Sequence, residues 1–178
     1  MKFLSLLFFC FPLFSTALEG LYYQLYTDAY VAQHLQANLS CVTAIFDDRG
    51  FYIFNGYRMH TSSISKYKGQ FVPTLDKENC FDMKPSVHKN TTNQICLFPV
   101  DAQGRYIVAT NGNFQRTFIL TQYQPNASWP SLDDPDFVMV NQTLQNYHLA
   151  NNLVRTNHSS CFFYPPKDLD YILKKPNA

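Results

Sequence analysis

The cysteines and histidines are the side chains with the greatest capacity for chemistry in this sequence. Cys10 lies in an apolar leader, and the four cysteines that follow it are Cys41, Cys80, Cys96 and Cys161. None of the four forms a Cys-x-x-Cys pair, the spacing that structural zinc sites use. An even number of widely spaced cysteines is typical of disulfides in an oxidising compartment, so we expect two disulfides and no metal site.

The histidines give no sign of catalysis. They are dispersed along the chain at His34, His60, His88, His148 and His158. The sequence contains no serine nucleophile elbow with triad partners, no His-Glu-x-x-His motif and no glycine-rich phosphate loop. We therefore predict a protein that is not an enzyme and that carries no cofactor.

The N-terminus indicates secretion. Lys2 precedes an apolar run over residues 3–14, and small residues at 15–17 lie where a signal peptidase cleaves. We predict a signal peptide over residues 1–17 and a secreted, extracellular mature chain. Five Asn-x-Ser/Thr sequons agree with that compartment and predict glycosylated surface positions at Asn38, Asn90, Asn126, Asn141 and Asn157.

Charge and composition exclude two classes of partner. The net charge is +1 and the basic residues are scattered, so the chain lacks the basic stripe that nucleic-acid binding needs. The leader is shorter than the ~20 apolar residues that span a bilayer, and no later run approaches that length, so we expect no stable transmembrane anchor. With 16 Phe, 12 Tyr and only 6 Gly, the composition favours strands around a ring-lined core.

Between residues 20 and 122, short alternating runs are separated by turn residues, a pattern typical of an antiparallel meander. The clearest hairpin joins residues 41–46 to residues 51–59 through a turn that ends at Gly50. Asn111-Gly112 predicts a two-residue turn between the last two strands. Further runs complete seven or eight strands at residues 21–26, 63–72, 80–83, 94–98, 105–110 and 114–120.

After Pro125 the pattern becomes helical. An N-cap acceptor and a proline at residues 133–135 precede apolar residues at three- and four-residue spacing, namely Phe137, Val140, Leu144 and Tyr147. A short strand at residues 153–154 follows. We predict an all-β fold, an eight-stranded antiparallel up-and-down β-barrel with one C-terminal α-helix packed outside, because closure leaves no strand edge unpaired. The domain covers residues 18–164, and residues 165–178 form a flexible tail.

The order of several short motifs resembles the lipocalin family, and within it the branch of apolipoprotein D and the bacterial lipocalins. The motifs are Gly20-Leu-Tyr-Tyr, where the family has Gly-x-Trp-Tyr, then Cys41-Val-Thr-Ala-Ile-Phe, and the segments 104–111, 118–126 and 153–161. The resemblance implies a lipocalin-like barrel. It also implies a disulfide between Cys41 and Cys161, which leaves Cys80 to pair with Cys96.

The sequence departs from the lipocalin pattern at three places, and at one of them Thr110-Asn111-Gly112 stands where the family has Thr-Asp-Tyr. The family tryptophan is Tyr22 and the arginine that stacks on it is Gln122, so we expect a tyrosine–amide contact in place of a cation–π contact. The stretch from Tyr106 to Gln122 is shorter than the three strands the family has there. Either one strand is missing, or residues 80–83 supply an additional one, and we prefer the second because an open barrel leaves an apolar edge.

Strand alternation and the resemblance together predict a ligand pocket inside the barrel. By strand alternation, Val42, Ala44 and Phe46 lie on the same face of their strand. The lipocalin resemblance implies that this face points into the barrel. We expect an apolar pocket whose few oriented polar groups are tyrosine hydroxyls. An interior simply filled by the same rings is the alternative. The predicted ligand-binding residues are Tyr30 at the mouth, Ala44, Phe46, Tyr52, Phe54, Tyr106 and Phe118.

These features predict a secreted protein that binds and transports a small hydrophobic ligand such as a sterol, fatty acid, retinoid or pigment. The alternative is a secreted interaction or amine-scavenging lipocalin that acts through loops at the barrel mouth, where a protein or receptor also finds room to bind. Inward-facing acidic residues would favour an amine, whereas Asp47, Asp48 and Asp101 fall at turns.

Overall fold

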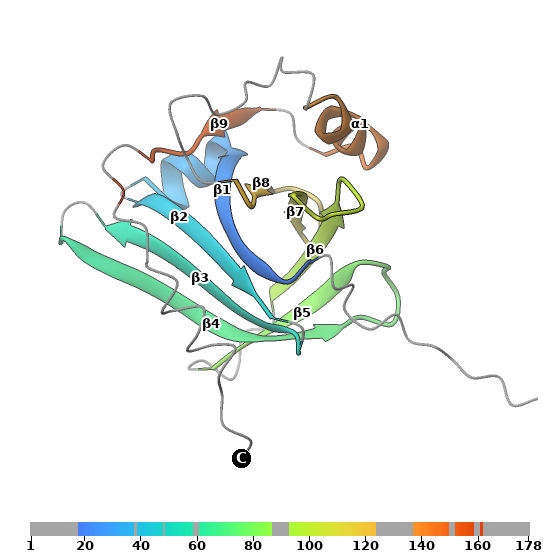
Figure 1. Ribbon diagram of the computed structural model, residues 1–178, viewed down its shortest axis with the longest axis horizontal. Coiled ribbons are helices and arrows are strands. Elements are labelled where there is room, and N and C mark those ends of the chain that lie inside the picture. The colour runs from blue at the N-terminus through green and yellow to red at the C-terminus, as the bar shows by residue number, and fades with distance from the viewer. Residues whose placement is uncertain are drawn as a thin grey trace, which may run out of the picture.

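Eight antiparallel strands follow one another around a closed barrel (Figure 1), in a computed structural model that describes residues 18–37, 39–47, 49–58, 61–86, 93–123, 137–149, 152–158 and 161. Each strand pairs with the next, and β8 and β2 both pair with β1. The eight strands are β1 Gly20–Asp28, β2 Leu39–Phe46, β3 Phe51–Arg58, β4 Ser63–Pro73, β5 Cys80–Pro85, β6 Asn93–Pro99, β7 Tyr106–Asn111 and β8 Thr117–Thr121.

Several sequence predictions fall outside the described residues. These are the signal peptide over residues 1–17, the tail over residues 165–178, and the sequons at Asn38, Asn90 and Asn126. The predicted fold class, in contrast, is confirmed by the strand order and by the helix outside the barrel.

The β2–β3 hairpin forms as predicted. Gly50 has a φ of 81°, a left-handed conformation that glycine adopts without steric cost. The Asp47 carboxylate closes the turn because its Oδ1 accepts hydrogen bonds from the backbone N–H groups of Arg49 and Phe51, both at 2.9 Å. Directly opposite residues in an antiparallel pair share one face of the sheet, so the pairing of Phe46 with Tyr52 turns both rings inward.

Aromatic rings fill the closed end of the barrel. Tyr52 stacks on Phe71 with ring centroids 4.6 Å apart, and Phe46 lies 5.7 Å from Phe71. Tyr52 lies so close to Gly69 on β4 that a Cβ at position 69 would overlap the tyrosine hydroxyl and the Lys84 carbonyl. These rings belong to an interior cluster made of Leu18, Tyr22, Ala44, Phe46, Tyr52, Phe71, Met83, Ile95, Leu97, Ile107, Ala109 and Leu120.

The expected tyrosine–amide contact closes this end of the barrel. Gln122 Nε2 donates a hydrogen bond to Tyr22 Oη at 3.0 Å and another to the Glu19 carbonyl at 3.3 Å. The Tyr22 side chain is fully buried, and burial raises the pKa of its hydroxyl to about 12. The prediction that tyrosine and glutamine replace the tryptophan–arginine pair is confirmed.

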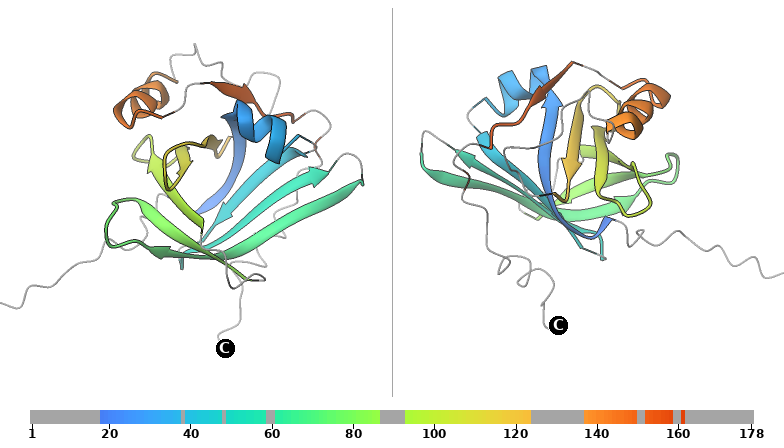
Figure 2. Two further views of the ribbon diagram at one scale, coloured as in Figure 1. Left: turned by 180° about the vertical axis from the view of Figure 1, so that it is seen from behind. Right: turned by 45° about the horizontal axis from the view of Figure 1, so that its top comes forward.

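A second apolar cluster lies outside the barrel, between the sheet and helix α1 (Val138–Asn146). Phe137 is fully buried there, with its ring centroid 5.8 Å from Tyr26 and 5.7 Å from Tyr106. Val140 and Leu144 bury the same face of the helix. The views in Figure 2 place α1 beside the outer surface of the barrel. Neither described helix is long and apolar enough to cross a membrane.

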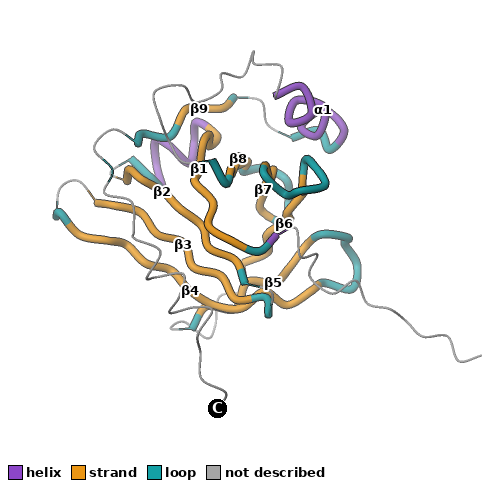
Figure 3. Tube along the Cα trace, viewed as in Figure 1, coloured by secondary structure: helices purple, strands orange, loops and turns teal. Residues whose placement is uncertain are grey.

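Residues 153–155 lie beside the end of β1, as Figure 3 shows. Strand β9 (Leu153–Arg155) pairs with the second half of β1, in agreement with the predicted short strand. The Thr156 N–H donates to the Leu25 carbonyl at 3.0 Å, and the Cys41 N–H donates to the Asn157 carbonyl at 2.9 Å. Residues 153–158 therefore bridge β1 and β2, and we call them the strap.

Two disulfides pair the four described cysteines. Cys41 bonds to Cys161 with Cα atoms 5.5 Å apart, which ties β2 to a cysteine three residues beyond the strap. Cys80 bonds to Cys96, and these residues are direct partners in the β5–β6 register. Cys80 and Cys96 both belong to the apolar cluster outside the barrel. The pairing that the lipocalin resemblance implied is present in full.

The structure also settles the strand count near the C-terminal side of the barrel. The stretch from Tyr106 to Gln122 holds two strands, and β5 is the additional barrel strand. The predicted two-residue turn at Asn111-Gly112 is wrong. Asn111 Oδ1 instead accepts from the backbone N–H groups of Gln115 and Arg116, both at 2.8 Å, and this asparagine closes a wider loop before β8.

Candidate ligand-binding site

A cavity of about 240 Å³ lies inside the barrel between the closed-end rings and the open end. Its apolar walls come from strands that face one another across the barrel, chiefly Phe54 on β3, Ala109 on β7 and Phe118 on β8. The lining residues are Gln24, Gln36, Val42, Phe54, Met83, Asn93, Gln94, Ile95, Ala109, Asn111, Phe118 and Leu120.

Side-chain amides provide the polar part of the lining. Gln24 on β1 and Gln36, which follows the short π-helical segment η2 (Val31–Leu35), hydrogen-bond to each other in both directions. Gln24 Nε2 also donates to Thr156 Oγ1 at 3.0 Å. This wall of the cavity is therefore assembled from β1, the loop after it and the strap, which are far apart in sequence.

The Asp28 carboxylate positions the loop that carries Gln36. Asp28 is buried at the end of β1, where Oδ1 accepts from the Val31 N–H at 3.1 Å and Oδ2 accepts from the Thr117 N–H at 3.2 Å. One side chain thus fixes the start of η2 against the start of β8. The Gln36 amide is held over the cavity as a consequence.

Two of the predicted ligand-binding residues line the cavity and three lie beneath it. Phe54 and Phe118 are in the lining. Ala44, Phe46 and Tyr52 face inward as expected, but they are packed into the interior cluster below. A contact between these five residues and a ligand stays a prediction.

Tyr106 does not face the interior, and the expected orientation is wrong. The β7–β8 register pairs Ala109 with Phe118 and Ile107 with Leu120, so these four residues share the inner face. Tyr106 therefore points outward, where its ring packs against α1.

Tyr30 lies outside the described cavity lining, in the loop after β1 that also carries Gln36. Its side chain is 48% exposed. The Arg116 guanidinium lies 3.9 Å above the Tyr30 ring centroid, and the ring of His34 lies 4.5 Å from it. The loop before β8 and the loop after β1 meet through this cation–π contact.

Sequence reasoning missed the amides of the lining. Gln24 is two residues after Tyr22 on β1, so strand alternation alone places it on the inner face. No comparable signal exists for Gln36, because it lies in a loop. Tyrosine hydroxyls were expected to supply the oriented polar groups, whereas the polar groups of the described lining are amides and no tyrosine lies among them.

The described lining contains neither a charged side chain nor a thiol. Asp47 and Asp101 lie at turns as predicted, where they pair with Arg49 and Arg105. Within the described part of the chain, no group of three or more histidine, cysteine, aspartate or glutamate side chains gathers closely enough to hold a metal ion. The cavity offers apolar contact and neutral hydrogen bonding.

Neither of the two remaining described sequons is among the described lining residues. Asn141 is half-buried on α1, and Asn157 is exposed in the strap. Glycosylation at either position stays a prediction.

Solved structures with the same barrel are lipocalins. The major allergen Per a 4 from cockroaches is 16% identical, with a TM-score of 0.60 over 84% of this chain and 90% of that chain. Apocrustacyanin C1 is 15% identical, with a TM-score of 0.55 over 88% of this chain and 84% of that chain. No protein-family model and no curated protein sequence matches the chain. The chain has the lipocalin fold.

Proposed function

We propose that the protein is a secreted carrier that holds a small hydrophobic ligand inside the barrel. The observation that carries the proposal is the cavity of about 240 Å³, whose walls are mainly aliphatic and aromatic. Apolar walls with a few placed polar groups are the usual composition of a ligand pocket, and burial of apolar ligand surface supplies the binding free energy.

The size of the cavity favours a compact ligand. Pockets for drug-sized molecules occupy about 300–1,000 Å³, so 240 Å³ is below that range. One or two fused rings or a short chain fill such a volume. A sterol, retinoid, long fatty acid or extended pigment would project through the open end.

A cavity-filling variant tests the carrier proposal. Ala109→Phe places a ring in the cavity and should abolish binding of a fluorescent apolar probe such as 1-aminoanthracene. Ala102→Phe is the matched control, because Ala102 is exposed in the turn between β6 and β7. Circular dichroism should show folded protein for both variants. Probe binding that survives Ala109→Phe would exclude this cavity as the site.

Native mass spectrometry of the deglycosylated secreted protein should detect the natural ligand as added mass. Denaturing extraction should then release a molecule of low mass. A protein that emerges without a ligand and takes up no apolar probe would contradict the carrier proposal and would favour an interaction protein.

The alternative function is an interaction through the barrel mouth. Its support is the exposure of Tyr30 and Leu35, at 48% and 65%, on the loop beside the opening. A protein partner that binds there should lose affinity with Tyr30→Ala, while probe binding in the cavity should persist. Scavenging of an amine has less support, because none of the described lining residues is acidic.

We also infer secretion, glycosylation and membership of the lipocalin family in the apolipoprotein D branch. The two disulfides and the five sequons support an oxidising compartment, and the Cys41–Cys161 bridge is the feature that the branch resemblance implies. Expression in a secretory cell line should deliver the chain to the medium. Enzymatic removal of N-linked glycans should then lower its mass.

A further inference from the structure

The amide pair in the cavity wall leaves one hydrogen-bond donor unused. A carboxamide has two N–H donors and one carbonyl oxygen with two lone pairs. Gln24 uses both donors, to Gln36 Oε1 at 2.8 Å and to Thr156 Oγ1 at 3.0 Å. Gln36 Nε2 uses one donor, to Gln24 Oε1 at 3.2 Å. Among the described residues, Gln36 therefore keeps one N–H and one lone pair of Oε1 for another partner.

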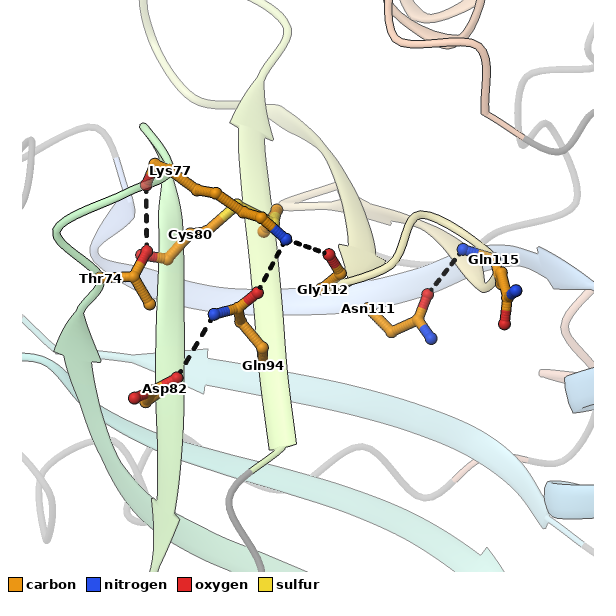
Figure 4. The surroundings of a disulfide bond; sticks show 9 residues. Thr74, Lys77, Cys80, Asp82, Gln94, Asn111, Gly112 and Gln115 are labelled. Carbon is orange, nitrogen blue, oxygen red and sulfur yellow. Dashed lines mark hydrogen bonds between the residues drawn. A yellow bond between two sulfur atoms is a disulfide. The ribbon is translucent and has the colours of Figure 1, made fainter.

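Two amides of the opposite wall, Gln94 and Asn111, hydrogen-bond to neighbouring strands and loops, as Figure 4 shows. Gln94 Oε1 accepts from Lys77 Nζ at 3.3 Å, and Gln94 Nε2 donates to Asp82 Oδ1 at 3.5 Å. The Asn111 carbonyl oxygen accepts two backbone N–H groups of the following loop. By the same count, among the described residues, Gln94 keeps one N–H and Asn111 Nδ2 keeps both of its donors. Asn93, Gln94 and Asn111, however, also line a neighbouring pocket together with Lys77. Gln36 lines only the barrel cavity, so it is the lining amide with a spare donor that belongs to this cavity alone.

The charge of the lining limits what the ligand can carry. A buried ionised carboxylate or ammonium without a partner costs several kilocalories per mole or shifts its pKa until it is neutral. None of the described lining residues carries a charge. Lys77 is outside the lining, where its Nζ donates to the Gly112 carbonyl at 2.8 Å in addition to Gln94.

We propose that the ligand is an uncharged apolar molecule with a hydroxyl or carbonyl head group, and that Gln36 is the residue that hydrogen-bonds this head group. The inference rests on the proposed carrier function and assigns the chemistry of the ligand. Gln24 and Thr156 are positioning residues, because they orient Gln36 from β1 and from the strap.

A matched ligand series tests this assignment. The series is 2-methylnaphthalene, 2-naphthalenemethanol, 2-naphthoate and 2-naphthylmethylamine, and each compound displaces 1-aminoanthracene from the full mature chain at pH 7.4. The alcohol should bind about three- to tenfold more tightly than the hydrocarbon, the ratio expected for one hydrogen bond. The two ions should bind at least about tenfold more weakly than the hydrocarbon.

Variants of Gln36 test whether the preference for the alcohol over the hydrocarbon depends on this residue. Gln36→Leu should make the affinities of the alcohol and the hydrocarbon equal, whereas Gln103→Leu, an exposed turn position outside the lining, should leave their ratio unchanged. Gln36→Glu is close to isosteric and should make the amine the preferred member of the series.

The outcomes separate this inference from the carrier proposal. If the probe binds but all four compounds bind equally, if an ion binds best, or if Gln36→Leu leaves the alcohol preference intact, the head-group assignment is overturned and the carrier function stands. If neither the probe nor any compound binds the wild-type chain, the carrier function itself fails.

Discussion

Removal of the Cys41–Cys161 disulfide should destabilise the protein more than removal of Cys80–Cys96. The first bond closes a loop with a sequence separation of 120 residues, and the second closes one of 16. In the chain-entropy model these loops correspond to about 5 and about 3 kcal/mol of stability at 25 °C. Cys41→Ala/Cys161→Ala should therefore cost about 2 kcal/mol more than Cys80→Ala/Cys96→Ala.

The backbone of Cys41 adds a second, separable effect. Cys41 lies at the bulge of β2, where the register with β3 shifts between Ser40 and Thr43, and its φ is 55°. A left-handed conformation costs roughly 1–2 kcal/mol for a residue that has a Cβ. Cys41→Gly/Cys161→Ala should therefore be about 1 kcal/mol more stable than Cys41→Ala/Cys161→Ala.

Urea unfolding followed by tyrosine fluorescence and circular dichroism measures these differences, with equal slopes required for comparison. If the alanine variant is unfolded in water, trimethylamine N-oxide restores a measurable transition without adding contacts. The reasoning is refuted if loss of the long-loop disulfide costs no more than loss of the short-loop one, or if glycine at position 41 is less stable than alanine.

Three further predictions concern single residues. Burial lowers the pKa of His158, so the neutral side chain's contribution to stability is present above the unfolded pKa of about 6.5 and is lost as the pH falls below it. In urea unfolding measured at several pH values, His158→Asn should therefore reduce the loss of stability on the acid side. Gly69→Ala should cost about 2–3 kcal/mol because its Cβ meets the Lys84 carbonyl, whereas Gly56→Ala should cost less because it meets only a flexible side chain. A smaller loss at position 69 than at 56 would contradict this. Asp28→Asn keeps one acceptor oxygen and replaces the other with a donor, so one of the two backbone hydrogen bonds is lost. It should cost about 2 kcal/mol, or roughly 6 °C in Tm by calorimetry, and an unchanged Tm would show that the lost hydrogen bond contributes nothing.

Local pattern was sufficient to predict much of the barrel. Alternation and turn residues identify the β2–β3 hairpin, and the replacement of two family residues together predicts the Tyr22–Gln122 contact. The apolar spacing from Phe137 to Leu144 predicts the outer helix, although α1 begins only at Val138. These features depend on residues close in sequence or on motifs with a fixed order along the chain.

The orientation of Tyr106 and the polar wall of the cavity were decided by tertiary structure. Alternation states which residues of one strand share a face, but only the pairing of β7 with β8 determines which face turns inward. The sequence thus determined the strands, the β2–β3 turn and the cysteines available for two disulfides. Only folding brought Gln24, Gln36 and Thr156 together, because contacts between β1, a loop and the strap depend on closure of the barrel.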